Sequence, residues 1–314
     1  MNLHKTIQAV GIGLMTLGCV STANAQQDPQ YTQYMYNTGA INPAYVGSKS
    51  NLSIFGLYRT QWVGMEGAPK TAHVSVSTPL GESGLGLGVN FVNDRLGAMD
   101  ENNISVDLSY TIDLSYDYKL AFGLKGTANL LSVDYQKLRI FDPSDGVSQE
   151  NINNKFNPNI GAGVYVYSDK AYFGLSVPKF LQVDRYNDNY DNQEVVTMRE
   201  KMHFYLMGGY VFDLSDNLKF KPAFLAKAIQ GSPLQVDVSA NFLIAEKFTL
   251  GAAYRWDAAL SALAGFQVND NLFVGYSYDA ETTALRHYNS GSHEIVLRFD
   301  IFSRTGRINA PRFF

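Results

Sequence analysis

The feature that most constrains this chain is an alternation of apolar and polar residues that repeats along most of its length. In the segment 70–80 the apolar positions are Ala72, Val74, Val76, Thr78 and Leu80. The segments 234–242 and 293–302 repeat the pattern. Side chains at every second position of a β-strand point to the same face. Each predicted strand therefore has one apolar face and one face that tolerates charge.

The alternation predicts an all-β chain of about fourteen strands. Charged residues make up 17% of the chain and aromatic residues 13%, including 20 Tyr and 19 Phe, which suits apolar residues diluted by polar ones. The expected strands span 50–62, 69–80, 84–94, 102–115, 118–134, 156–168, 170–178, 201–213, 218–228, 233–245, 247–257, 259–268, 271–280 and 291–302.

The connections between these strands indicate which kind of β-protein to expect. Very short turns alternate with longer segments, which are 95–101, 135–155, 179–200 and 281–290. Short periplasmic turns and longer extracellular loops are typical of a single transmembrane outer-membrane β-barrel with antiparallel strands. A large soluble sandwich or soluble barrel is the alternative. That alternative accounts less well for the alternation of short turns with long connections and for the many Tyr and Phe near strand ends.

The ends of the chain suggest a division into four parts. Residues 1–25 combine a basic start, an apolar stretch and the Ala23-Asn24-Ala25 site of a cleaved Sec signal peptide. A lipoprotein signal ending at Cys19 is a weaker alternative, because the apolar residue usual three positions earlier is missing. We then expect a periplasmic or plug segment at 26–48, the barrel at 49–302 and a periplasmic tail at 303–314.

The glycine-rich stretch 77–91 resembles a nucleotide-binding loop only superficially. A dinucleotide fingerprint leads from a strand into a helix, whereas Gly84, Gly86 and Gly88 run into the strand-like sequence VNFVND. We therefore expect a hairpin turn from Gly81 to Gly84. Gly86 and Gly88 should face inward, where they would leave room for a neighbouring segment.

No motif in the sequence predicts catalysis, a cofactor or a metal. The five histidines form no H-E-x-x-H pattern, and no G-x-S-x-G elbow is present. The acidic segments 142–151 and 184–194 lack the spacing of an EF-hand, so solvated loops are favoured over calcium sites. With 25 Lys and Arg against 29 Asp and Glu and no basic run, nucleic acid is not an expected partner.

Charged residues at inward positions of the predicted strands are candidates for the lumen. They are Arg59, Lys125, Arg255, Asp257, Arg298 and Asp300. Opposite charges that pair inside a dry lumen cost less than isolated charges. Alternatively, the same residues would select solutes in an open pore.

The segment 26–48 shows no alternation, yet it is rich in tyrosine. A disordered tail seldom carries so many aromatic residues, so we expect this segment to pack inside or beneath the barrel. The aromatic candidates for plugging or partner binding are Tyr31, Tyr34, Tyr36, Tyr45, Trp62, Tyr186 and Tyr190.

Several stretches resemble the PorP/SprF family of outer-membrane proteins, which belong to the Bacteroidetes type IX secretion and gliding-motility system. The resemblance rests on QDPQYTQYMYNTGAINPAYVGS, YRTQWVGMEGAPKTAHVSVSTPL, GLGLGVNFVNDRLG and YNSGSHEIVLRF. These stretches are distributed over essentially the whole chain that follows the predicted signal peptide.

The resemblance implies an outer-membrane barrel without enzymatic activity. It also implies one of two roles. The favoured role is binding the C-terminal domain of a large secreted adhesin for its export or surface anchoring. The other is a core-machine barrel that docks to a periplasmic peptidoglycan-binding partner and ring lipoproteins. A passive solute channel is the alternative from another functional class.

Overall fold

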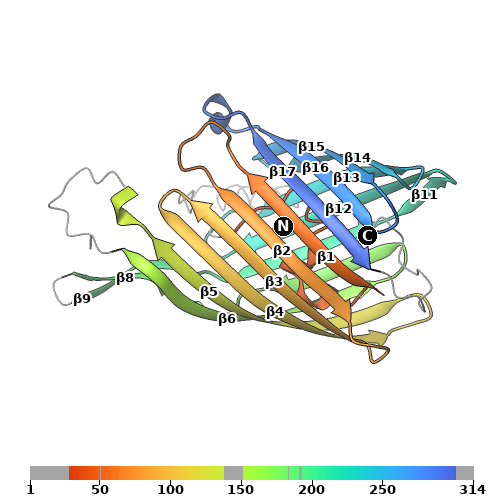
Figure 1. The fold of residues 1–314 in the computed structure, drawn as a ribbon, viewed down its shortest axis with the longest axis horizontal. Coiled ribbons are helices and arrows are strands. Elements are labelled where there is room, and N and C mark those ends of the chain that lie inside the picture. Colours follow the sequence, from red (N-terminus) through yellow and green to blue (C-terminus); the bar gives the residue numbers. More distant parts are fainter. Residues whose placement is uncertain (1–27, 50, 138–150, 183, 191–192, 302–314) are drawn as a thin grey trace, which may run out of the picture.

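The chain forms a closed antiparallel β-barrel (Figure 1). The computed structural model describes residues 28–49, 51–137, 151–182, 184–190 and 193–301. The predicted signal peptide 1–25, most of the segment 142–151 and the predicted tail 303–314 lie outside the described residues. No helix in the described part of the chain is long and apolar enough to cross a membrane.

The wall of the barrel contains fourteen strand positions, because β11 continues the line of β10. Its strands are β1 (Leu52–Thr60), β2 (Lys70–Pro79), β3 (Leu85–Leu96), β4 (Met99–Asp113), β5 (Lys119–Val133), β6 (Ile152–Tyr167), β7 (Ala171–Val177), β10 (His203–Tyr210), β11 (Phe212–Ser215), β12 (Leu218–Ile229), β13 (Gln235–Ile244), β14 (Phe248–Arg255), β15 (Ala259–Gln267), β16 (Leu272–Glu281) and β17 (Ser292–Ile301). The predicted fold class and strand number are confirmed.

Closure depends on two pairings that join distant parts of the chain. The first strand β1 lies beside the last strand β17, with Leu52 opposite Ile301 and Thr60 opposite His293. Strand β10 pairs with β12 and with β7, although the segment between β7 and β10 is long. With every strand except the short β11 paired on both sides, the backbone groups of the wall are satisfied without water, as a lipid bilayer requires.

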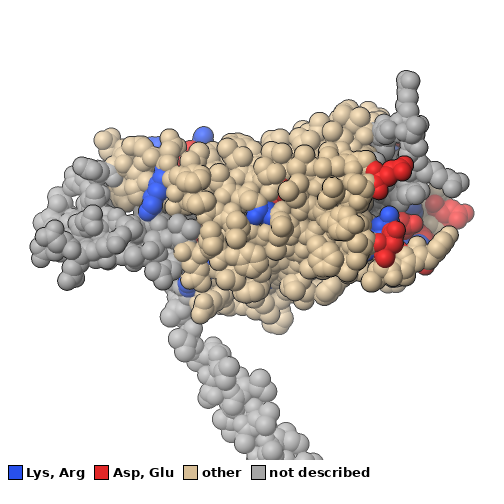
Figure 2. All heavy atoms as spheres, turned by 90° about the horizontal axis from the view of Figure 1, so that it is seen from below, with Lys and Arg blue, Asp and Glu red and all other residues tan. Residues whose placement is uncertain are grey.

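The two faces of the wall have opposite chemistry. Along β17, for example, Ile295, Leu297 and Phe299 are exposed on the outside, whereas Glu294 and Arg298 are buried inside. The face seen in Figure 2 is largely uncharged, and charged side chains gather mainly toward its two ends. An apolar exterior around a polar interior is the arrangement of a barrel that lies in lipid.

The connections differ from prediction at one end of the barrel. The segment 95–101 is not a long loop, because β3 and β4 extend toward each other and leave only Gly97 and Ala98 between them. The segment 179–200 contains a separate hairpin of β8 (Asp184–Tyr190) and β9 (Gln193–Arg199), so 184–194 is not a simple loop. Figure 1 shows this hairpin projecting from the barrel at the end of the longer connections.

The predicted turn between β2 and β3 forms as a hairpin. The Leu80 amide donates to the Leu85 carbonyl at 2.8 Å. Gly81 and Gly84 adopt φ values of 66° and 76°, which favour glycine. The glycines of this stretch therefore form a hairpin turn, and the chain continues directly into β3 without a helix.

The described residues form only short helical turns, and two of these lie inside the barrel. The segment before β1 contains α2 (Thr38–Ile41) and the 3₁₀ turn η1 (Pro43–Tyr45). Two further 3₁₀ turns, η2 (Tyr135–Lys137) and η3 (Ala284–His287), lie in connections between strands. Contacts join η1 to β4, β5 and β6, so the segment packs against the inner wall.

Candidate functional site: a lumen filled by the N-terminal segment

Residues 28–48, which we call the plug segment, occupy the lumen. Its residues 32–38 are all buried, as are Ile41, Asn42, Ala44 and Val46. The segment has few internal hydrogen bonds of its own beyond its short turns. Its fixed position therefore depends on contacts with the barrel wall.

The first group of contacts centres on Arg59 of β1. Its guanidinium contacts Asp279 Oδ2 at 2.7 Å and Glu294 Oε2 at 3.2 Å. The two carboxylates also accept hydrogen bonds from the plug segment. The Thr32 amide donates to Glu294 at 3.0 Å, and the Thr32 hydroxyl donates to Asp279 at 2.7 Å. The Gln33 amide donates to the second oxygen of Glu294 at 2.8 Å.

This arrangement gives three buried charges enough partners to be tolerated in the lumen. Isolated buried charges are costly, and a buried ion pair is favourable only when its remaining lone pairs are satisfied. Here Thr32 and Gln33 of the plug segment donate several of the hydrogen bonds that the two carboxylates accept. The ion pairs of the wall and the docking of the plug segment are consequently coupled.

The second group of contacts holds the middle of the plug segment. Asn42 donates from Nδ2 to the Val164 carbonyl at 3.0 Å, while its Oδ1 accepts from the Ala44 amide at 3.0 Å. Ser176 Oγ donates to the Ile41 carbonyl at 2.9 Å. The Val46 carbonyl accepts a hydrogen bond from Ser109.

Wall glycines make room for these contacts. A methyl group added at Gly123 would overlap the backbone of Pro43 and Ala44, and one added at Gly163 would overlap Asn42. The predicted inward glycines Gly86 and Gly88 lie against Val46 and Gly47 in the same way. The close approach of the two backbones requires a missing side chain at these positions.

The four tyrosines of the plug segment lie together in the lumen. Tyr34 hydrogen-bonds to Ser239 at 3.3 Å. Tyr36 packs against Phe273 and beneath Lys221, whose Nζ lies 4.9 Å from its ring centre. Tyr31 packs against His73, and Tyr45 meets Tyr165 edge to face. Burial raises the pKa of Tyr36 to about 12 and raises that of the other three further, so all four remain neutral hydroxyls.

The start of the plug segment is held by charges near the end of the barrel with longer connections. Asp28 Oδ1 lies 2.9 Å from Lys179 Nζ, which also contacts Glu200 at 2.8 Å. The other Asp28 oxygen contacts His203 Nδ1. Burial alone would raise the pKa of Asp28, but Lys179, His203 and Lys227 together hold it well below its ordinary value of 3.8.

Five of the six predicted lumen charges have buried side chains on the inner wall. Lys125 pairs with Asp107 at 3.4 Å and donates to the Ala40 carbonyl at 3.3 Å. Arg255 pairs with Asp237 at 2.6 Å and donates to the Gln30 side chain at 2.9 Å. Arg298 and Asp300 contact each other at 3.1 Å. Together with Arg59, these residues form ion pairs around the plug segment.

Asp257 is the exception, and its predicted lumen position is wrong. Strand β14 ends at Arg255, and Asp257 lies exposed in the turn that follows, with a φ of 52°. Aspartate tolerates the left-handed region better than most residues, which suits it to a turn. The predicted strand 247–257 continues two residues past Arg255 because the turn that follows contains no glycine or proline to mark it.

The three remaining aromatic candidates lie away from the plug segment. Trp62 is half-buried in the β1–β2 connection, where its Nε1 donates to Glu281 at 2.7 Å. Tyr186 and Tyr190 belong to strand β8 of the projecting hairpin, and their side chains lie outside the part that the structure describes.

Sequence reasoning missed the acidic partners, namely Asp107, Asp237, Asp279 and Glu294. A signal was available, since Asp107 lies directly opposite Lys125, and Asp237 directly opposite Arg255, in neighbouring strands. Short turns fix the register of such hairpins. The Arg59–Glu294 pair spans β1 and β17 and depends on closure, which no local pattern reveals.

The described residues gather no group of three or more His, Cys, Asp or Glu that could hold a metal ion. What the lumen offers chemically is charge pairing, hydrogen bonding and aromatic contact. These interactions are suited to holding a polypeptide segment in place.

A family model described as type IX secretion system membrane protein PorP/SprF matches residues 23–299. None of the curated proteins matches this chain in sequence.

Solved structures similar to the chain are membrane barrels. The outer-membrane protein Omp33 of Acinetobacter baumannii matches at 7% identity and a TM-score of 0.46, over 81% of this chain and 100% of that one. The toluene transporter TbuX of Ralstonia pickettii matches at 8% identity and a TM-score of 0.46, over 86% of this chain and 93% of that one. The monoaromatic hydrocarbon channel CymD matches at 10% identity and a TM-score of 0.48, over 86% of this chain and 92% of that one.

Proposed function

This chain belongs to the PorP/SprF family of type IX secretion system membrane proteins, and from that membership we propose that it is a non-catalytic binding partner of a secreted protein. In this proposal the barrel lies in the outer membrane and binds the C-terminal domain of a large cell-surface adhesin. Binding would serve export of the adhesin or its anchoring at the surface.

The observation that carries the proposal is the filling of the lumen by the plug segment. A passive channel conducts through hydrated space lined by groups that bind solutes weakly. Here, Arg59, Asp279 and Glu294 are committed to one another and to Thr32 and Gln33. This supports a barrel that works through its surfaces.

The connections at one end offer the larger contact area. The β8–β9 hairpin projects there, and the β1–β2, β5–β6 and β16–β17 connections lie at the same end. We assign this end to the cell surface, because outer-membrane barrels carry their longer loops outside. An isolated two-stranded hairpin is marginally stable in water, which suits it to folding against a partner.

The alternative is the role of a core-machine barrel that docks to periplasmic proteins. It would need a docking face at the end with short turns. Connections such as 80–84 and 168–170 offer little area there. We therefore favour the cargo-binding role.

The proposal is tested by gentle affinity purification of the tagged protein from native outer membranes, followed by mass spectrometry. Recovery of one very large secreted protein through its C-terminal domain is the expected result. Recovery of a peptidoglycan-binding protein and ring lipoproteins instead would favour the core-machine role. If neither were recovered and the purified barrel conducted ions, the binding role would be contradicted in favour of a channel.

A further inference from the structure

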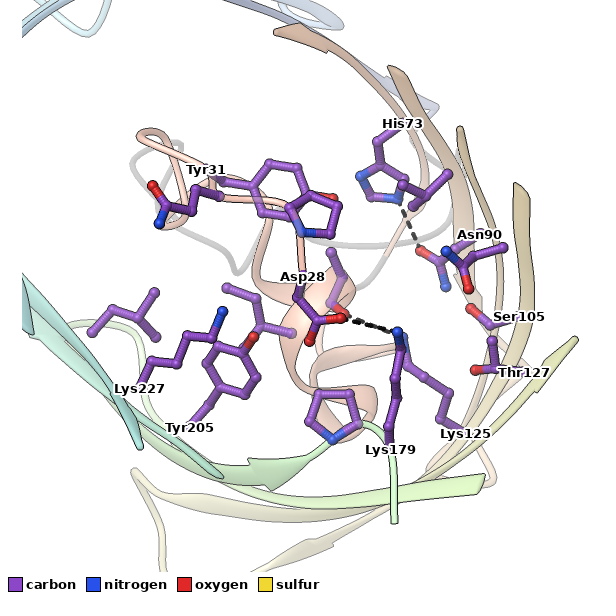
Figure 3. A pocket seen from close by; sticks show the side chains of 18 of the residues that line it. Asp28, Tyr31, His73, Asn90, Ser105, Lys125, Thr127, Lys179, Tyr205 and Lys227 are labelled. Atoms are coloured by element: carbon purple, nitrogen blue, oxygen red, sulfur yellow. Dashed lines mark hydrogen bonds and ion pairs between the residues drawn. The ribbon is translucent and has the colours of Figure 1, made fainter. Parts of the chain in front are cut away.

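A cavity of about 110 Å³ lies in the lumen between the plug segment and the wall (Figure 3). Asp28, Tyr31 and Ile41 contribute from the plug segment. On the wall, Lys179 follows β7, Gln235 begins β13 and Arg255 ends β14, so the cavity lies toward the end with longer connections. This volume is several times that needed for one water molecule.

The charges that line the cavity are predominantly positive. They are Lys125, Lys179, Lys227 and Arg255 against Asp28 and Asp237. Three of the four cations have acidic partners, because Lys125 pairs with Asp107, Lys179 with Asp28 and Glu200, and Arg255 with Asp237.

Lys227 differs from the other three cations. Only 4% of its surface is exposed, and no carboxylate among the described residues lies within ion-pair distance of its Nζ. Figure 3 shows its side chain reaching toward the cavity beside Tyr205, whose ring centre lies 5.8 Å from Nζ. Asp28 and Asp237 attract Lys227 only from beyond ion-pair distance. A buried cation without an anion in direct contact is unfavourable, and a bound carboxylate would supply that contact.

A second unmatched group lies across the cavity. His73 is fully buried, and its Nε2 contacts Asn90 Oδ1 at 3.3 Å. Its Nδ1 has no hydrogen-bond partner among the described residues. Because Asn90 Oδ1 can only accept, Nε2 is the donor and Nδ1 is an acceptor. His73 therefore adds polarity to the cavity but does not contact a carboxylate oxygen.

We propose that this cavity binds an organic carboxylate the size of acetate or of an acidic side chain, with Lys227 contacting its charge. The polar wall residues Ser105, Thr127 and Tyr205 add hydroxyl groups, and Ile41 and Leu225 add apolar surface for a short carbon chain. Charge-assisted hydrogen bonds from an ammonium to a carboxylate are among the stronger ones in proteins. The site does not depend on the proposed contact with a secreted protein.

The test uses the full-length barrel in detergent micelles and ¹³C-labelled acetate, with binding followed by saturation-transfer NMR. Acetamide serves as the neutral isostere, and inorganic phosphate as a competing oxyanion. N-acetylaspartate N-methylamide carries a single side-chain carboxylate and mimics an acidic residue of a polypeptide. Heat-modifiable mobility on a gel verifies that each variant is folded.

We expect saturable binding of acetate that acetamide does not reproduce. Lys227→Met should weaken it about tenfold or more, whereas Lys227→Arg should retain it. Lys70→Met is the control, because Lys70 is exposed at the same end of the barrel and does not line the cavity.

Binding of the aspartate derivative would identify a polypeptide side chain as a possible ligand. Binding of acetate alone would identify a free small carboxylate, and either result supports the site. Absence of saturable acetate binding, equal binding of acetamide, stronger binding of phosphate than of acetate, or unchanged acetate binding by folded Lys227→Met would overturn the proposal.

Discussion

At the residue scale, the barrel differs from a soluble protein in what it buries. The fully buried side chains include Arg59, Lys221, His73 and Glu294, whereas many leucines and valines, such as Leu124 and Val89, are exposed on the outside. Most of the buried charges in the interior are matched to a partner, as Arg59 is to Asp279 and Glu294. Removing one partner from such a set leaves another charge buried and uncompensated.

Replacing Arg59 with methionine should destabilise the docked plug segment. Asp279 and Glu294 would lose their cation, and the free energy of unfolding should fall by about 3–5 kcal/mol. Urea unfolding in lipid and hydrogen exchange at residues 32–36 would measure it. Arg95→Met is the control, because the Arg95–Asp100 pair is exposed and should contribute less than about 1 kcal/mol. Equal effects of the two substitutions would contradict the account.

A methyl group on the inner wall should also displace the plug segment. Gly123→Ala would bring its Cβ into the backbone of Pro43 and Ala44, at a cost of about 1–3 kcal/mol. Gly126→Ala is the matched control on the same strand, since Gly126 faces outward with no atom within 4 Å of an added Cβ. Hydrogen exchange of residues 40–46 should increase in the first variant and stay unchanged in the second.

At the scale of elements, the plug segment is held at several separate points. Thr32 and Gln33 contact one side of the barrel, and Asn42 contacts the other. Asp28 attaches its start near the end with longer connections. Loss of one attachment therefore leaves the others in place.

The attachment at Asp28 should depend on pH. Because its pKa in the folded protein lies well below 3.8, the ionised carboxylate stabilises docking. That contribution is fully present well above pH 3.8 and is lost as pH falls toward the folded-state pKa. Amide protection factors at residues 30 and 31 should therefore be constant from pH 7 to about pH 5 and fall as pH is lowered below about 3.8. Asp28→Asn should be less protected at pH 7 and lose less on acidification; an identical pH response would contradict the attachment.

The projecting hairpin is the element to which the proposed function assigns partner contact. Replacing residues 184–199 with a short Gly-Ser linker should leave the barrel folded but reduce capture of the secreted protein from native membranes. The same linker inserted between Tyr116 and Asp117, in an exposed turn at the opposite end, is the control. Unchanged capture by the hairpin variant would exclude the hairpin as the contact.

At the scale of the whole molecule, the sequence predicts the wall better than its contents. Each strand carries one lipid-facing side, so alternation is strict enough to locate all fourteen strand positions. The position of the plug segment depends on contacts such as Thr32–Glu294, which join residues 262 positions apart. Its tyrosines indicated order, but neither their neighbours nor the cavity beside Lys227 could be derived from local patterns.

The filled lumen is the central claim, and ion conductance across a planar bilayer tests it most directly. The full-length barrel should show little or no stable conductance. A folded variant lacking residues 28–48 should open stable channels, because the wall remains closed while its contents are gone. If the full-length protein conducted as well as the shortened variant, the plug segment would not close the barrel, and a solute channel would become the better account.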